Sequence, residues 1–188
     1  MIVGEAMAEV GKMLDDPSFV HTEAGVAMMQ LSRAQEWVAL RYELLRQTVS
    51  LTLTADISLY HLPSRYPRMK RLVAVDWGSK TLFPMNWKDL QVLDTQWIAH
   101  TQALRYYYLW GITYLGFFPV PDANEIVNLT MVVTSQALTT GGQSLEVPNS
   151  YLPSVIRVAA GILRVILEHD PAGIKMVQEG LGVARGAG

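Results

Sequence analysis

The chain has no cysteine, and this absence removes several kinds of chemistry at once. Disulfide bonds, thiolate metal sites and cysteine nucleophiles are all excluded. Charge is also scarce, because 17% of the residues are Asp, Glu, Lys or Arg, whereas globular domains carry about 25%. Two explanations of this deficit remain open at this point, namely a dense hydrophobic core and burial of surface against other protein subunits.

The sequence also lacks three other features, namely an excess of basic charge, an export signal and a membrane span. The formal net charge of −2 provides no basic field that would hold nucleic acid tightly. Residues 1–16 carry acids where a signal peptide carries positive charge. The aromatic stretch between Arg105 and Asp122 is too short to span a membrane, which takes about 20 apolar residues, and its glycines and prolines would break a helix. We therefore expect no association with a membrane.

Motifs for catalysis are missing as well. The four histidines, His21, His61, His100 and His169, lie in separate segments, and none has the i, i+4 spacing of a helical metal site. Residues 78–81 lack the glycine and the Gly-Lys pair of a phosphate-binding loop, and no serine lies in a G-x-S-x-G motif. The sequence thus predicts no catalytic residue, no metal site, no cofactor and no enzyme activity.

Helical periodicity marks both ends of the chain. Residues 2–14 and residues 23–47 are predicted as helices, and the second is apolar over nearly twice the width of one face. One of its stripes contains Val26, Met29, Trp37, Leu40 and Leu44, and the other contains Ala27, Leu31, Ala34, Val38, Tyr42 and Leu45. The remaining polar arc contains Gln35, Glu36, Glu43 and Arg46. One stripe can pack on the chain's own core, which leaves the other for a neighbouring subunit or for another helix of the same chain. A helix from about Tyr151 to Glu168 is apolar nearly all round and is predicted to be central, and Asp170 begins a short last helix.

Between these helices the periodicity changes from about 3.6 to 2, which indicates strands. About six short strands are predicted, among them Thr81-Leu82-Phe83. Asn86 is predicted to cap a short helix that follows this strand. The expected fold is therefore α+β, with N- and C-terminal helices forming a helical bundle and an inserted antiparallel β domain. The predicted boundaries are 1–48 and 149–182 for the bundle, 49–148 for the β domain and 183–188 for a flexible C-terminal tail.

Two features of the sequence, the tryptophans and a basic segment, can each be interpreted in more than one way. The five tryptophans suit core or interface packing, and a sugar-stacking or nucleic-acid platform is the alternative. The basic residues Arg65, Arg68, Lys70 and Arg71 lie close together in the sequence. They can form a solvated strand edge that discourages wrong pairing, or they can contact an acidic partner or passing DNA.

Several short motifs follow one another in a recognisable order over residues 20–170. In chain order they are Leu31-x-x-Ala34-Gln35-x-x-Val38-Ala39, Tyr60-x-Leu62-Pro63, Phe117-Phe118-Pro119-Val120-Pro121-Asp122-Ala123, Val147-Pro148-x-x-Tyr151 and Ala159-Ala160. Together they resemble the head-to-tail adaptor (connector) proteins of tailed bacteriophages. No single motif is specific, and the resemblance rests on their order.

The resemblance implies a structural protein of the virion, synthesised in the host cytoplasm and located in the neck between capsid and tail. Such adaptors form a dodecameric ring under the portal protein, extend the DNA channel without sequence-specific DNA binding, and offer a surface to a tail or nozzle protein. They have no catalytic residues. In related adaptors a C-terminal segment docks on the portal, which here points to Leu181, Val183 and Arg185.

The physical properties of the sequence agree with a ring subunit, because a ring needs lateral faces that are not meant for water. We expect the subunit interface to contain Arg33, Trp37, Arg41 and Tyr42. Arg65, Arg68, Lys70 and Arg71 are the expected outer or tail contact. Two other functions compete with an adaptor, namely another neck component (a stopper or terminator) and a carbohydrate- or receptor-binding β-sandwich.

Overall fold

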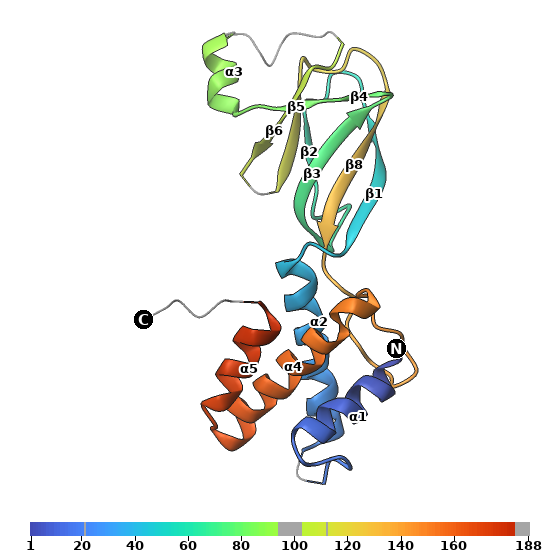
Figure 1. The fold of residues 1–188 in the computed structure, drawn as a ribbon. Helices are drawn as coiled ribbons and strands as arrows, with labels where there is room; N and C mark the ends of the chain where they lie inside the picture. The colour runs from blue at the N-terminus through green and yellow to red at the C-terminus, as the bar shows by residue number, and fades with distance from the viewer. Residues whose placement is uncertain (21, 94–102, 112, 183–188) are drawn as a thin grey trace. The chain divides into compact units, whose positions relative to one another are not determined.

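The structure, a computed structural model, describes residues 1–20, 22–93, 103–111 and 113–182. Within these residues the chain has an α+β fold with five α-helices and two four-stranded sheets (Figure 1). It divides into two compact units. The helical unit contains Met1–Leu45 and Thr134–Gly188, and the sheet unit contains Arg46–Val133. The predicted α+β class is confirmed.

The helical unit is organised around its most apolar helix, α4. Its elements are α1 (Val3–Met13), α2 (Ala24–Arg41), the 3₁₀ turn η1 (Asn149–Tyr151), α4 (Leu152–Leu163), the π-helical turn η2 (Arg164–Glu168) and α5 (Ala172–Gly180). Helix α4 contacts α1, α2 and α5, and nine of its residues are buried. By length and composition the stretch Asn149–Glu168 could cross a membrane, but 50% of its most apolar window is buried inside the chain, as is typical of a core helix.

Helix α2 is shorter than predicted, because it ends at Arg41 and not near Gln47. Glu43 has a left-handed φ of 51°, a conformation that a helix of L-residues does not contain. The chain then enters the first strand at Arg46. The apolar periodicity of residues 44 and 45 misled the prediction, since both side chains pack against the helical core without being helical.

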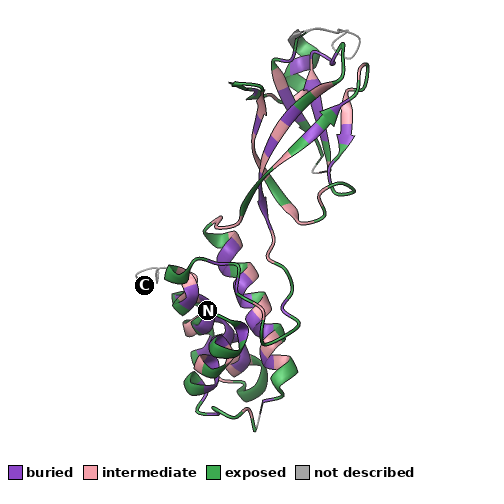
Figure 2. Cartoon of the chain, turned by 90° about the vertical axis from the view of Figure 1, so that its right-hand side faces the viewer, coloured by how far each residue is buried: buried purple, intermediate pink, exposed green. Residues whose placement is uncertain are grey.

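The sheet unit contains two sheets. One has the strand order β1-β8-β3-β4 and the other β2-β7-β6-β5. The strands are β1 (Arg46–Leu53), β2 (Leu59–His61), β3 (Met69–Trp77), β4 (Lys80–Thr81), β5 (Phe83–Pro84), β6 (Tyr106–Trp110), β7 (Tyr114–Phe118) and β8 (Glu125–Val133), and α3 (Trp87–Leu93) lies between β5 and β6 in the sequence. All pairs are antiparallel except β5 with β6, which is parallel. Strands of both sheets contain buried residues, and Figure 2 shows buried stretches of strand in purple.

The described residues thus contain eight strands where about six were predicted. Thr81-Leu82-Phe83 was expected to be one strand, but the chain changes sheets there. Leu82 is buried and its amide donates to the Val75 carbonyl at 2.8 Å, between β4 in one sheet and β5 in the other. Strands of two residues are too short to produce an alternating pattern that a sequence could reveal.

The boundaries of the units also differ from the expected ones. Residues 134–148 were assigned to the β domain, yet they belong to the helical unit, because Leu138, Leu145 and Val147 are buried in the helical core. The chain passes between the units twice, after Leu45 and after Val133. Arg46 pairs with Val132, so both passages lie at the same end of two neighbouring strands.

Removing the Asp16 carboxylate is expected to destabilise the helical unit. Asp16 is buried just after α1, where its carboxylate accepts hydrogen bonds from the amides of Val20 at 2.8 Å and Thr22 at 3.0 Å. An unsatisfied buried group costs about 1–3 kcal/mol, so Asp16→Ala should lower the free energy of unfolding, measured in urea, by about 2 kcal/mol. Asp16→Asn keeps one carbonyl acceptor and should lose less. Equal losses in the two variants would argue against this explanation.

Candidate functional site

Helix α2 presents one exposed stripe on the surface of the helical unit. Met29, Arg33, Trp37 and Arg41 follow one another at a spacing of four residues, and all four are exposed. The other predicted stripe supplies the buried residues Ala27, Leu31, Ala34 and Val38. The predicted stripe that contains Trp37 is mixed, because Met29 and Trp37 are exposed while Val26, Leu40 and Leu44 are half-buried.

Trp37 borders an apolar groove of about 240 Å³ in the helical unit. The groove is lined by Trp37 from α2, by Ile162, Val165 and Ile166 from α4 and η2, and by Ile174, Val177 and Gln178 from α5. Three of these side chains are substantially exposed, namely Trp37 at 44%, Ile166 at 46% and Ile174 at 52%. Exposed apolar side chains gathered in one groove are typical of a protein-protein interaction site.

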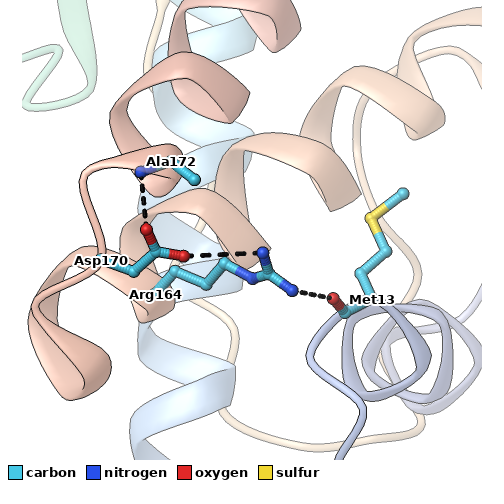
Figure 3. Close-up of polar contacts among 4 residues, drawn as sticks. All are labelled: Met13, Arg164, Asp170 and Ala172. Atoms are coloured by element: carbon cyan, nitrogen blue, oxygen red, sulfur yellow. Dashed lines mark hydrogen bonds and ion pairs between the residues drawn. The ribbon is translucent and has the colours of Figure 1, made fainter.

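Close packing of α5 on α4 holds one side of this groove in place. The helices approach at glycines, since a Cβ atom at Gly161 would lie 2.6 Å from the Gly173 carbonyl oxygen and one at Gly180 would lie 2.6 Å from Val158 Cγ2. The Arg164 guanidinium lies 3.7 Å from the Asp170 carboxylate and donates to the Met13 carbonyl at 3.2 Å (Figure 3). Asp170 in turn accepts from the Ala172 amide at 2.8 Å, so the turn between the helices is tied to α1.

The other residues of the expected subunit interface have partners within the unit. Arg33 Nη1 donates to Gln30 Oε1 at 3.3 Å. Arg41 Nε donates to the Leu181 carbonyl at 3.5 Å, where a cation suits the C-terminal end of α5. The Tyr42 ring packs against Tyr151 with centroids 5.1 Å apart. Of the four expected residues, Trp37 is the one that lines the groove.

The expected portal contact is described in part. Leu181 packs against the helical core and its carbonyl is the acceptor for Arg41. Val183 and Arg185 lie outside the described residues.

The basic segment belongs to the sheet unit. The Arg65 guanidinium lies 5.9 Å from the centre of the Tyr60 ring, which is within reach of a cation–π interaction. Arg65 and Arg68 line a hollow of about 190 Å³. Lys70 and Arg71 follow on β3 and are exposed. Lys70 and Arg71 thus lie on β3, while Arg65 and Arg68 lie around a hollow that Gln47 of β1 and Met131 and Val133 of β8 also line.

A second cleft, of about 460 Å³, lies in the sheet unit between α3 and β6. Trp87 on its rim stacks on Trp110, with centroids 5.5 Å apart and planes 12° from parallel. The Asn86 carboxamide accepts from the Lys88 amide at 3.0 Å and begins α3, as predicted. Burial raises the pKa of Tyr108 to about 12, against a smaller lowering by its hydrogen bond with Ser58. Tyr108 therefore stays a neutral phenol, and the cleft gains no ionised group from it for catalysis.

Among the residues that the structure describes, no cluster of three or more His, Asp or Glu residues could hold a metal ion.

The groove contains residues that the sequence analysis missed. Ile166 and Ile174 were assigned to a central helix and to a short last helix, without a surface role. A signal existed in the sequence, because Ile166 and Leu167 continue the apolar pattern to the very end of their helix, where one face has no core left to contact.

Comparison with known protein families gave a match over most of the chain. The family model described as SU10 adaptor protein matches residues 1–173. No curated protein matches the chain.

Proposed function

Because the chain belongs to the SU10 adaptor protein family, we propose that it forms a ring in the neck of a tailed phage, docks below the portal protein, extends the DNA channel and connects to the tail. The family makes it a structural adaptor of a phage virion. We propose three further properties. The chain forms a ring of many copies, with twelve as the expected number. The ring contacts the portal, and it contacts a tail or nozzle protein.

The observation that carries the proposal is the apolar groove beside Trp37. A ring subunit needs a lateral face that another copy covers, and such a face is apolar and poor in charge. The groove has this character, since Gln178 is its one polar lining residue among those the structure describes. The low charged fraction of 17% points the same way.

Passage of DNA is compatible with the charge of the subunit. A ring lined with many cations would bind phosphates and oppose movement of the genome. This chain has 15 basic and 17 acidic residues, so it offers no net attraction. We assign the basic residues Arg65, Arg68, Lys70 and Arg71 to contact with an acidic surface of a tail protein.

Assembly on the portal tests the proposal. The purified chain is mixed with the portal protein of the same phage, and native mass spectrometry counts the copies bound. We expect a complex with about twelve copies, and cryo-electron microscopy of the virion should place them between portal and tail. Density for this chain at the tail tip, or no complex with the portal, would contradict the assignment and favour another tail component.

A further inference from the structure

The two sheets differ in how well their edges are protected against pairing with another strand. Unprotected edges invite pairing, and proteins guard them by shortness, charge, proline or bulges. Strands β2, β4 and β5 have three, two and two residues. Strand β3 extends beyond β4, but it carries Lys70 and Arg71 and two register shifts against β8. Each of these edges is therefore short, charged or irregular.

Strand β1 has none of these protections. It is an edge strand of eight residues, and residues 47–53 contain neither charge nor proline. Its register with β8 is unbroken from Arg46 opposite Val132 to Leu53 opposite Glu125, so no bulge twists the edge away. Among the described residues, no strand pairs with its outer side. The Tyr66 hydroxyl donates to the Ser50 carbonyl at 3.1 Å, and that oxygen keeps a second lone pair.

The side chains of β1 alternate cleanly between two faces. On one face Thr48, Ser50 and Thr52 are exposed. Thr48 is hydrogen-bonded to Thr130 across the pair at 3.1 Å, and Ser50 donates to Asn128 at 2.9 Å. On the other face Leu51 and Leu53 are buried and Val49 is half-buried. A partner strand must match uncharged hydroxyls on one face and aliphatic side chains on the other.

We propose that β1 pairs antiparallel with β1 of a second copy, with Ser50 opposite Ser50 on a two-fold axis. This register uses the whole uncharged segment. Over residues 48–52 it sets Thr48 opposite Thr52 and Val49 opposite Leu51, so hydroxyl meets hydroxyl and aliphatic meets aliphatic. At the ends of the segment Gln47 lies opposite Leu53. A shift of one residue would put polar side chains opposite apolar ones. A second copy is thus a matching partner in hydrogen bonding, side-chain pattern and lack of charge.

The pairing goes beyond the proposed function and is independent of it. A two-fold contact uses the same surface on both copies and cannot by itself build a ring. The β1 pair is therefore a state of the free chain, in which two copies cover each other's open sheet edge before either joins the neck. It uses no residue of the Trp37 groove.

Cysteine cross-linking tests the pair and its register, because the chain has no other thiol. Ser50→Cys is expected to form a disulfide-linked dimer under mild oxidation. Thr52→Cys is the matched control, exposed on the same face of the same strand. Its two copies would lie roughly 13 Å apart along the strands, beyond the roughly 7 Å between Cα atoms that a disulfide allows. A mixture of Thr48→Cys and Thr52→Cys should cross-link again. Equal cross-linking of Ser50→Cys and Thr52→Cys alone, or none with Ser50→Cys, would overturn the proposal.

A variant without a thiol supplies a second measurement. Ser50→Lys places like charges opposite each other, which destabilises a strand pair. Sedimentation of the wild-type chain should show a monomer–dimer equilibrium, and S50K should weaken the dimer by up to about fivefold while its circular dichroism is unchanged. A wild-type chain that stays monomeric, or an S50K dimer of unchanged strength, would refute the pairing. S50K should still bind the portal. Failure of the β1 pairing can therefore be distinguished from failure of the proposed ring assembly.

Discussion

Trp37→Asp is expected to abolish assembly on the portal while the chain stays folded. The indole is 44% exposed and lines the apolar groove. In a ring it would be covered by the next copy, and a carboxylate there would be buried without a partner. Truncating a tryptophan at the centre of an interface costs about 2 kcal/mol or more, and the cost recurs at every contact around a ring. Native mass spectrometry with the portal, together with thermal unfolding of the free chain, measures both effects.

Met29→Asp is the matched control for this prediction. Met29 lies on the same helix and is 46% exposed, but it does not line the groove. Its variant should still assemble. If Trp37→Asp assembles normally, the groove is not a lateral contact. If that variant unfolds, Trp37 belongs to the core of the monomer and its proposed place in the interface is wrong.

Gly161→Ala is expected to lower the free energy of unfolding by about 1–3 kcal/mol, the usual cost of overpacking. The added Cβ would lie 2.6 Å from the Gly173 carbonyl oxygen, 2.9 Å from Val177 Cγ2 and 3.0 Å from Met176 Cβ. The nearest obstacle is backbone, so α5 has to move as a whole. Since Ile174 and Val177 line the groove from α5, assembly on the portal should weaken together with stability.

Gly25→Ala provides the comparison, because a methyl group added at this helical glycine would have no neighbouring atom within 4 Å. There the substitution should stabilise the chain by about 0.5–1 kcal/mol, as expected for alanine in a helix. Urea unfolding followed by circular dichroism separates the two variants. Equal midpoints for Gly161→Ala and the wild type would mean that α5 does not pack on α4 in this way.

Much of the fold was predictable from periodicity, and the errors have physical causes. The long strands and the helices were found because burial repeats every two or 3.6 residues over enough positions to be visible. The Asn86 cap was found because a side-chain acceptor suits an N-terminus. Strands β4 and β5 were predicted as one strand because a strand of two residues is too short to show the alternation of buried and exposed side chains. The segment 134–148 was misplaced because its buried residues, such as Leu138 and Leu145, lie too far apart to form a pattern.

The candidate site was less predictable. Trp37 stood out because its stripe had no assigned partner, but the groove is formed by α2, α4, η2 and α5, which meet only in the folded chain. Gln35 shows the same limit. It was placed on a polar arc, yet it is buried, and its side-chain amide oxygen Oε1 accepts from the Glu146 backbone amide at 2.8 Å. Sequence spacing gives the face of a helix on which a residue lies, whereas the segment that covers that face comes from elsewhere in the chain.

The two passages between the units have a consequence for how such a chain can be built and altered. Arg46 and Val132 are paired neighbours on β1 and β8, so the points at which the sheet unit is entered and left are about 5 Å apart. A segment whose ends lie side by side can be removed, replaced or exchanged for another, with the gap between Leu45 and Thr134 closed by a short turn. The sheet unit is in this sense an insertion that can be exchanged as a whole. The unit that we propose to meet the tail can therefore change from one phage to another without disturbing the packing of the helices.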